Sequence, residues 1–197
     1  MKFVDYVKVS TITFIIASFL SGCGYNTAVK NWKRAIFPSD VTVEKSAFDG
    51  VEKYSTTGYV YPTKDKEPGF LGFNPPVFSL EAIYTKNMNN HIHLGIKIDD
   101  IKAIQSVDFN IDGTKTIFDQ FTSSFTDIQK TGGYYSSSKW FKVDIAFIKT
   151  LLNSKDAKIR YTTFNRYSVG DFHYDYTQQG NTAKHALRNL LTKINKL

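Results

Sequence analysis

The sequence predicts a mainly β fold of the β-rich α+β class: an antiparallel sandwich or curled sheet with a short internal helix and a C-terminal amphipathic helix. From Val41 onward the dominant hydrophobic period is two residues, which is the period of a half-buried strand. Tyrosine, threonine, phenylalanine and isoleucine crowd these runs, and such residues favour pleated sheet surfaces. Two segments instead carry apolar residues at helical spacing, so two helices are expected beside the sheet.

The first strands are expected as antiparallel hairpins. Asp49-Gly50 marks a tight turn between strands at 41–48 and 51–61, because Asp-Gly favours two-residue hairpin turns. A strand at 77–84 is joined by a short polar connection to a strand at 91–98. The second of these strands has the clearest alternation in the chain, with one aliphatic face made of Ile92, Leu94, Ile96 and Ile98.

The strongest short hairpin signal is Asp112-Gly113, between strands predicted at 104–111 and 114–121. Later strands are predicted at three positions, which are 140–144, 158–164 and 168–176.

The internal helix is predicted over 144–154, where the apolar positions are Ile145, Ile148, Leu151 and Leu152. The tail from Asn181 carries a longer apolar stripe made of Ala183, Leu187, Leu190, Leu191 and Ile194. Asn181 or Thr182 can serve as its N-cap, since both side chains accept a hydrogen bond from the first helical turn.

Composition bounds the class of protein. The chain has 197 residues, 42% of them hydrophobic, which suits one domain with an ordinary core. Its single cysteine excludes an intrachain disulfide and a cysteine-based structural zinc site. The formal net charge of +7 would make nucleic acid the leading partner of a cytoplasmic chain.

The first two dozen residues change that interpretation. Lys2 and Lys8 precede 12 uncharged, mostly apolar residues at 9–20, which is short for a membrane span but typical of a secretory signal peptide. Leu20-Ser21-Gly22-Cys23 follows directly. This order resembles the lipobox of bacterial lipoproteins.

The resemblance implies cleavage before Cys23 and a covalent lipid on its thiol, with no other cofactor expected. Residues 1–22 would then be the signal peptide, 23–39 the lipidated N-terminus and tether, and 40–197 a single β-rich domain. Position 24 is Gly rather than Asp, which in enterobacterial lipoproteins favours the outer membrane. The expected partners are therefore the membrane, through the anchor, and an envelope protein; export removes nucleic acid from reach.

Three histidines are candidate metal ligands. His91 and His93 alternate with apolar residues on one strand, and His173 stands in a later one. Two imidazoles on one strand face can bind zinc if further ligands converge on them. The competing interpretation is a solvated face opposite the isoleucines, so we assign no metal site from the sequence.

Catalytic motifs are missing from the sequence, which has no G-x-S-x-G, H-E-x-x-H, P-loop lysine or dinucleotide fingerprint. Asp99-Asp100 is interpreted as a solvated turn, and Ser136-Ser137-Ser138 as a polar loop after two glycines. We therefore predict no catalytic residue.

The segment 67–76 has the most unusual local composition. It combines glycine and proline with Phe70, Leu71 and Phe73. These side chains either fold back over an open end of the sheet or form an exposed loop that binds a partner.

The sequence thus favours an envelope lipoprotein whose domain is a non-enzymatic binding or scaffolding module. Two alternatives stay open: a lipoprotein that binds glycan or lipid, and a metal-assisted envelope hydrolase.

Overall fold

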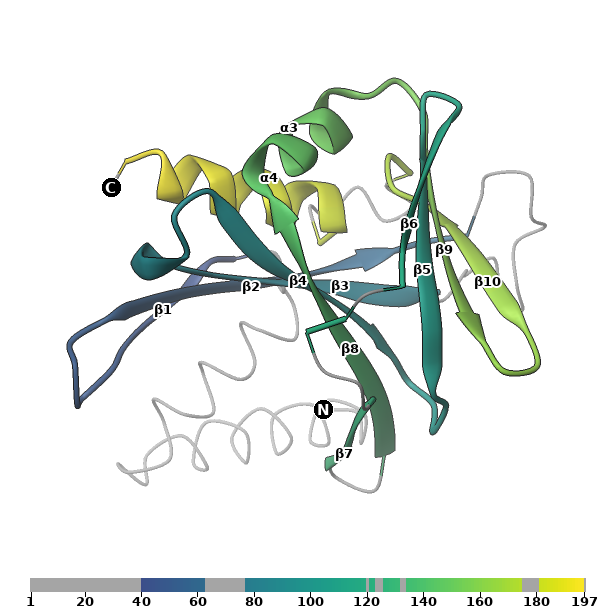
Figure 1. Ribbon diagram of the computed structural model, residues 1–197, viewed down its shortest axis with the longest axis horizontal. Coiled ribbons are helices and arrows are strands. Elements are labelled where there is room, and N and C mark those ends of the chain that lie inside the picture. The colour runs from purple at the N-terminus through teal and green to yellow at the C-terminus, as the bar shows by residue number, and fades with distance from the viewer. Residues whose placement is uncertain are drawn as a thin grey trace, which may run out of the picture. The chain divides into compact units, whose positions relative to one another are not determined.

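In the computed structural model, the described part of the chain forms two antiparallel sheets and two α-helices (Figure 1). The structure describes residues 40–62, 77–119, 121–122, 126–131, 134–174 and 181–196, all within the unit from Phe37 to Leu197. The predicted fold class, mainly β with a C-terminal helix, is confirmed.

The larger sheet has six strands in the order β1-β2-β3-β4-β8-β7, and every neighbouring pair is antiparallel. These strands are β1 (Thr42–Lys45), β2 (Glu52–Val60), β3 (Phe78–Thr85), β4 (His91–Ile98), β7 (Asp127–Thr131) and β8 (Tyr134–Asp144). The short 3-10 helix η2 (Lys86–Met88) connects β3 to β4, so this predicted hairpin is confirmed.

The smaller sheet has four strands in the order β10-β9-β5-β6. These are β5 (Ile104–Ile111), β6 (Thr114–Phe118), β9 (Ala157–Thr163) and β10 (Tyr167–Asp171). The predicted helices are α3 (Ile145–Asn153) and α4 (Ala183–Ile194). Both lie on the same side of the larger sheet (Figure 1).

The core lies on one face of the larger sheet. The isoleucine face of β4 is at most 2% exposed, as the alternation predicted. Phe109 of the smaller sheet packs edge-on against Phe141 of β8, with ring centroids 6.1 Å apart. Among the described residues, the buried cluster runs from Tyr54 to Leu191, within the unit from Phe37 to Leu197. Within the described ranges, no helix is long and apolar enough to cross a membrane.

Helix α4 begins directly on β2. A Cβ atom at Gly58 would lie 2.5 Å from the Ala183 Cα, closer than packed atoms can approach, so the strand has no room for a side chain there. Thr182 is the N-cap, and its side chain accepts a hydrogen bond from the His185 backbone N–H. Glycine in the strand therefore allows the helix to approach the sheet.

One predicted turn is confirmed and another is longer than predicted. Asp112 and Gly113 have φ angles of +49° and +87°, as a two-residue turn with positive φ at both positions requires. The connection at Asp49-Gly50 is instead a loop, closed by a hydrogen bond from the Ser46 N–H to the Val51 carbonyl at 2.9 Å. β1 therefore ends at Lys45, earlier than the predicted 41–48.

The predicted polar loop at Ser136-Ser137-Ser138 is wrong. These serines lie in β8, which begins at Tyr134, and Ser137 is fully buried. The Ser137 hydroxyl donates to the Asp100 carbonyl at 2.6 Å and accepts from the Lys102 N–H at 3.1 Å. Because the β4–β5 connection satisfies this hydroxyl, a serine-rich strand can be buried here.

Candidate functional site

The two sheets come together where β2 ends. The Asp171 N–H, at the end of β10, donates to the Tyr61 carbonyl at 2.8 Å, and the two residues form an antiparallel bridge. A Cβ atom at Gly170 would lie 2.4 Å from Val60 Cγ1, so glycine permits this approach. The hairpin of β9 and β10 is thereby placed beside the ends of β2, β3 and β4.

A cleft of about 410 Å³ lies at this junction. Its floor comes from the face of the larger sheet opposite the core, and strand register brings the floor residues together. Tyr59 pairs with Ser79, and Ser79 pairs with Lys97, so three strands contribute one row. Thr57 and Glu81 pair in the adjacent row. All five of these side chains line the cleft.

The wall of the cleft comes from the smaller sheet and the rim from a loop. Tyr161 of β9 lies in the wall with its ring edge-on to Phe78, the centroids being 5.5 Å apart. Arg166, in the β9–β10 turn, also lines the wall. The β4–β5 connection contributes Asp100 and Lys102 to the rim, and these two residues form an ion pair.

Burial sets the electrostatics of the floor. The Glu81 side chain is 23% exposed, and the Lys97 ammonium lies 3.7 Å from its carboxylate. Burial raises the pKa of Glu81, and the Lys97 charge only partly opposes that shift. Burial, followed by the nearby Asp99 charge, also raises the pKa of Tyr59, so this hydroxyl stays protonated and able to donate at neutral pH.

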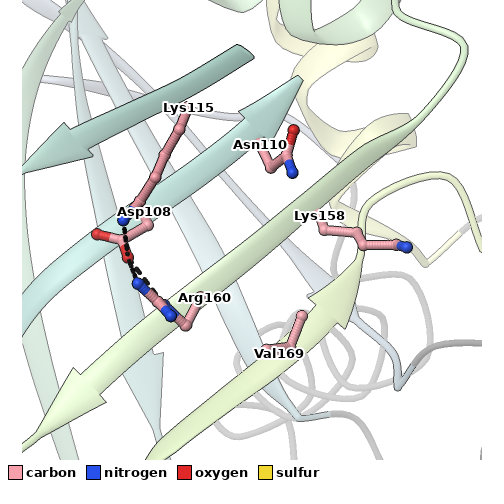
Figure 2. A pocket seen from close by; sticks show the side chains of 6 residues that line it. All are labelled: Asp108, Asn110, Lys115, Lys158, Arg160 and Val169. Carbon is pink, nitrogen blue, oxygen red and sulfur yellow. Dashed lines mark hydrogen bonds and ion pairs between the residues drawn. The ribbon is translucent and has the colours of Figure 1, made fainter. Parts of the chain in front are cut away.

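A second polar concavity, of about 240 Å³, lies on the smaller sheet. Figure 2 shows its centre, where Arg160 and Lys115 both reach Asp108. The Arg160 Nε donates to Asp108 Oδ2 at 2.8 Å, and the Lys115 Nζ lies 3.5 Å from the same oxygen. The Asp108 side chain is only 7% exposed.

The cations of this second surface do not converge on one open position. Arg160 and Lys115 both face Asp108, whereas the Lys158 side chain points away from it (Figure 2). The Arg160 guanidinium also lies over the Tyr167 ring, 5.7 Å from its centroid. We therefore interpret this surface as a cross-strand charge cluster that stabilises the sheet, and the cleft as the candidate binding site.

No family model, curated protein or solved structure matches this chain. The chemistry of the two polar surfaces therefore carries the functional inference.

Each of the three candidate histidines has a different polar neighbour. His91 Nδ1 lies 2.5 Å from Asp144 Oδ1. His93 pairs across the strands with Lys142, and burial, followed by the Lys142 charge, lowers its pKa. His173 Nε2 lies 2.9 Å from the Ser154 hydroxyl. No group of three potential metal ligands forms among the residues the structure describes.

Two sets of predicted site residues lie outside the described residues. One is the lipobox, which comprises Leu20, Ser21, Gly22 and Cys23; the other is the apolar loop set of Phe70, Leu71 and Phe73. The next described residue, Val77, lines the cleft.

The cleft itself was not predicted. The sequence predicted the strands β2 to β4, and clear alternation was identified only in β4. The wall residues stand about 100 positions later, and a two-residue period carries no information about which strands of different sheets meet.

Proposed function

We propose that this chain is a lipid-anchored bacterial envelope protein whose exported domain is a non-enzymatic binding module with the cleft as its ligand site. The anchor is the Cys23 thiol, and the cleavage site is Leu20-Ser21-Gly22-Cys23.

The residue order at the N-terminus supports the anchor. A charged start, a short apolar run, two small residues and the chain's only cysteine stand in the order that a lipobox requires. Each buried CH₂ group of an acyl chain contributes about 0.8 kcal/mol to membrane binding, so two or three chains hold a protein on a bilayer almost permanently.

The cleft supports binding rather than catalysis. Its pairs Lys97–Glu81 and Lys102–Asp100 combine opposite charges within ion-pair distance. The hydrogen bond from Lys102 lowers the pKa of Asp100, so this carboxylate is a weak general base. The sequence also has none of the common nucleophile motifs. Concave sites with a few fixed polar groups are the usual places for small ligands.

Labelling tests the anchor. In a bacterial host fed an alkyne analogue of palmitate, the wild-type chain should be labelled and Cys23→Ala should not, because only the Cys23 thiol can carry the diacylglyceryl group. The Gly24→Asp variant should keep its label but move from outer-membrane to inner-membrane fractions. An unlabelled wild-type chain, made and exported at normal levels, would overturn the proposed anchor.

A hydrolase is the weaker candidate. It needs the histidines to converge on a metal, and the described part of the chain forms no such group. A glycan-binding lipoprotein is the stronger alternative to a protein scaffold, because the cleft is lined largely by polar side chains.

A further inference from the structure

We infer that the cleft between the larger sheet and the β9–β10 hairpin binds a neutral saccharide. This inference rests on the proposal that the cleft is the ligand site, and it adds the chemical class of the ligand. Three properties of the lining carry it: charge balance, hydroxyl content and aromatic rings.

The charges of the cleft sum to zero. Its acidic lining residues are Glu81, Asp99 and Asp100, and its basic ones are Lys97, Lys102 and Arg166. Lys97 is 3.7 Å from Glu81, and Lys102 is paired with Asp100. A site without excess charge gives an ionic ligand no advantage, whereas its fixed ions remain strong hydrogen-bond partners for uncharged groups.

The hydroxyl groups of the lining suit a ligand that both donates and accepts. The cleft is lined by five hydroxyl-bearing side chains, which are Thr57, Tyr59, Ser79, Tyr161 and Ser168. Each hydroxyl can donate one hydrogen bond and accept others. Sugar hydroxyls have the same double capacity. The carboxylates of the cleft can only accept hydrogen bonds and its ammonium groups can only donate them.

Aromatic rings and cleft size agree with this ligand class. Tyr59 and Tyr161 bring a ring from each sheet to the cleft, and such rings offer an apolar surface next to a polar tip. A sugar ring combines the same two properties, with C–H groups on its faces and hydroxyls on its edge. The volume of about 410 Å³ lies in the lower part of the range for small-molecule sites, roughly 300–1,000 Å³, so a short oligosaccharide segment fits it.

The surface of the smaller sheet shows what an ionic site in this protein would offer instead. It has one acidic lining residue, Asp108, against three basic ones, Lys115, Lys158 and Arg160. Its surplus of positive charge would favour anions, whereas the balanced cleft does not. The two surfaces therefore differ in the ligand chemistry that they support.

Calorimetric titration of the domain spanning residues 37–197 tests the inference, since this unit contains the whole buried cluster of the described residues. The probes are maltotetraose, cellotetraose and chitotetraose, which are neutral oligosaccharides of similar length. At least one should bind with a Kd of about 1 mM or tighter. The Kd should change less than about twofold between roughly 50 and 500 mM salt, because a neutral ligand releases no counterions.

Matched variants locate the binding. Glu81→Gln and Arg166→Ala should each weaken binding by about tenfold, since each removes a charged hydrogen-bond partner from the lining. Asp119→Asn and Lys158→Ala make the same kinds of change at exposed positions outside the cleft and should leave the Kd unchanged. Thermal unfolding of each variant shows that its fold is intact.

Two results would overturn the inference. One is that none of the three neutral probes binds; binding of oligogalacturonate or a chitosan tetramer with a steep salt dependence would then show that the cleft takes an ion. The other is neutral binding that neither cleft variant weakens. Neither result affects the lipid anchor, which labelling of Cys23 tests separately.

Discussion

The six-stranded sheet exposes the same strands to two different environments on its two faces. In β2, Gly58 faces helix α4 at backbone contact distance, whereas its neighbours Thr57 and Tyr59 line the cleft. In β3, Leu80 is 1% exposed between Ser79 and Glu81, which belong to the cleft floor. One face is closely packed, whereas the other carries polar and charged side chains that line the cleft.

This difference separates stability from binding along a single strand. Core packing tolerates little change in volume, because a close-packed interior has no space for an added atom. Half-exposed polar groups can be exchanged at small cost to the fold, so they are free to serve a ligand. Substitutions at adjacent positions should therefore have opposite consequences.

Gly58→Ala should produce the largest effect on stability. Its Cβ would lie 2.5 Å from both the Thr182 carbonyl oxygen and the Ala183 Cα, and backbone atoms cannot move aside without displacing α4. Overpacking of this kind costs about 3 kcal/mol, which urea unfolding would measure. Thr57→Ser, on the opposite face, should change the free energy of unfolding by less than about 0.5 kcal/mol. Equal effects of the two substitutions would contradict the division between the faces.

Asp108→Asn should have the next largest effect on the free energy of unfolding. It tests whether the polar cluster of the smaller sheet, unlike the cleft floor, stabilises the fold. The change leaves Arg160 and Lys115 beside each other without a counter-charge. Breaking a buried ion pair costs 3–5 kcal/mol, and since both cations are partly exposed we expect about 2 kcal/mol. Urea unfolding measures the loss, with the exposed Asp119→Asn as the control. A variant as stable as the control would show that the cluster is not structural.

Elements with a local sequence pattern were predicted correctly, and elements that depend on distant contacts were not. Alternation in β4 and the apolar stripe of α4 identified core faces, because each pattern is local. The Asp112-Gly113 turn was identifiable because positive φ at both positions restricts the residues that fit. Strand β7 and the serine-rich start of β8 were missed, since burial of Ser137 depends on the Asp100 carbonyl and the Lys102 N–H from another connection.

The cleft was beyond sequence reasoning for a related reason. Its floor comes from the predicted strands β2 to β4, of which only β4 showed clear alternation. Its wall depends on the bridge between Tyr61 and Asp171. That bridge needs the bare backbone of Gly170 beside Val60. In the sequence Gly170 stands next to Asp171 in an ordinary strand pattern, so only the fold shows why a side chain is excluded there.

Glu81→Gln should have the smallest effect on stability, and its sign depends on pH. Burial raises the pKa of Glu81 in the folded protein above its usual value, and Lys97 offsets only part of the shift. The folded state therefore binds this proton more tightly than the unfolded chain does. Stability then decreases as pH rises through the folded-state pKa, because the ionised carboxylate is less well solvated than in the unfolded chain.

Glutamine cannot ionise, so the variant avoids that penalty. At pH 7 we expect Glu81→Gln to be more stable than the wild type by a few tenths of a kcal/mol, and the difference should become small near pH 4, where Glu81 is mostly protonated in both states. Urea unfolding at the two pH values measures it. If the variant is instead less stable at pH 7 and equal at pH 4, the ion pair with Lys97 outweighs burial. The cleft floor would then hold its charges for stability, as the Asp108 cluster does, and the functional difference between the two polar surfaces would be lost.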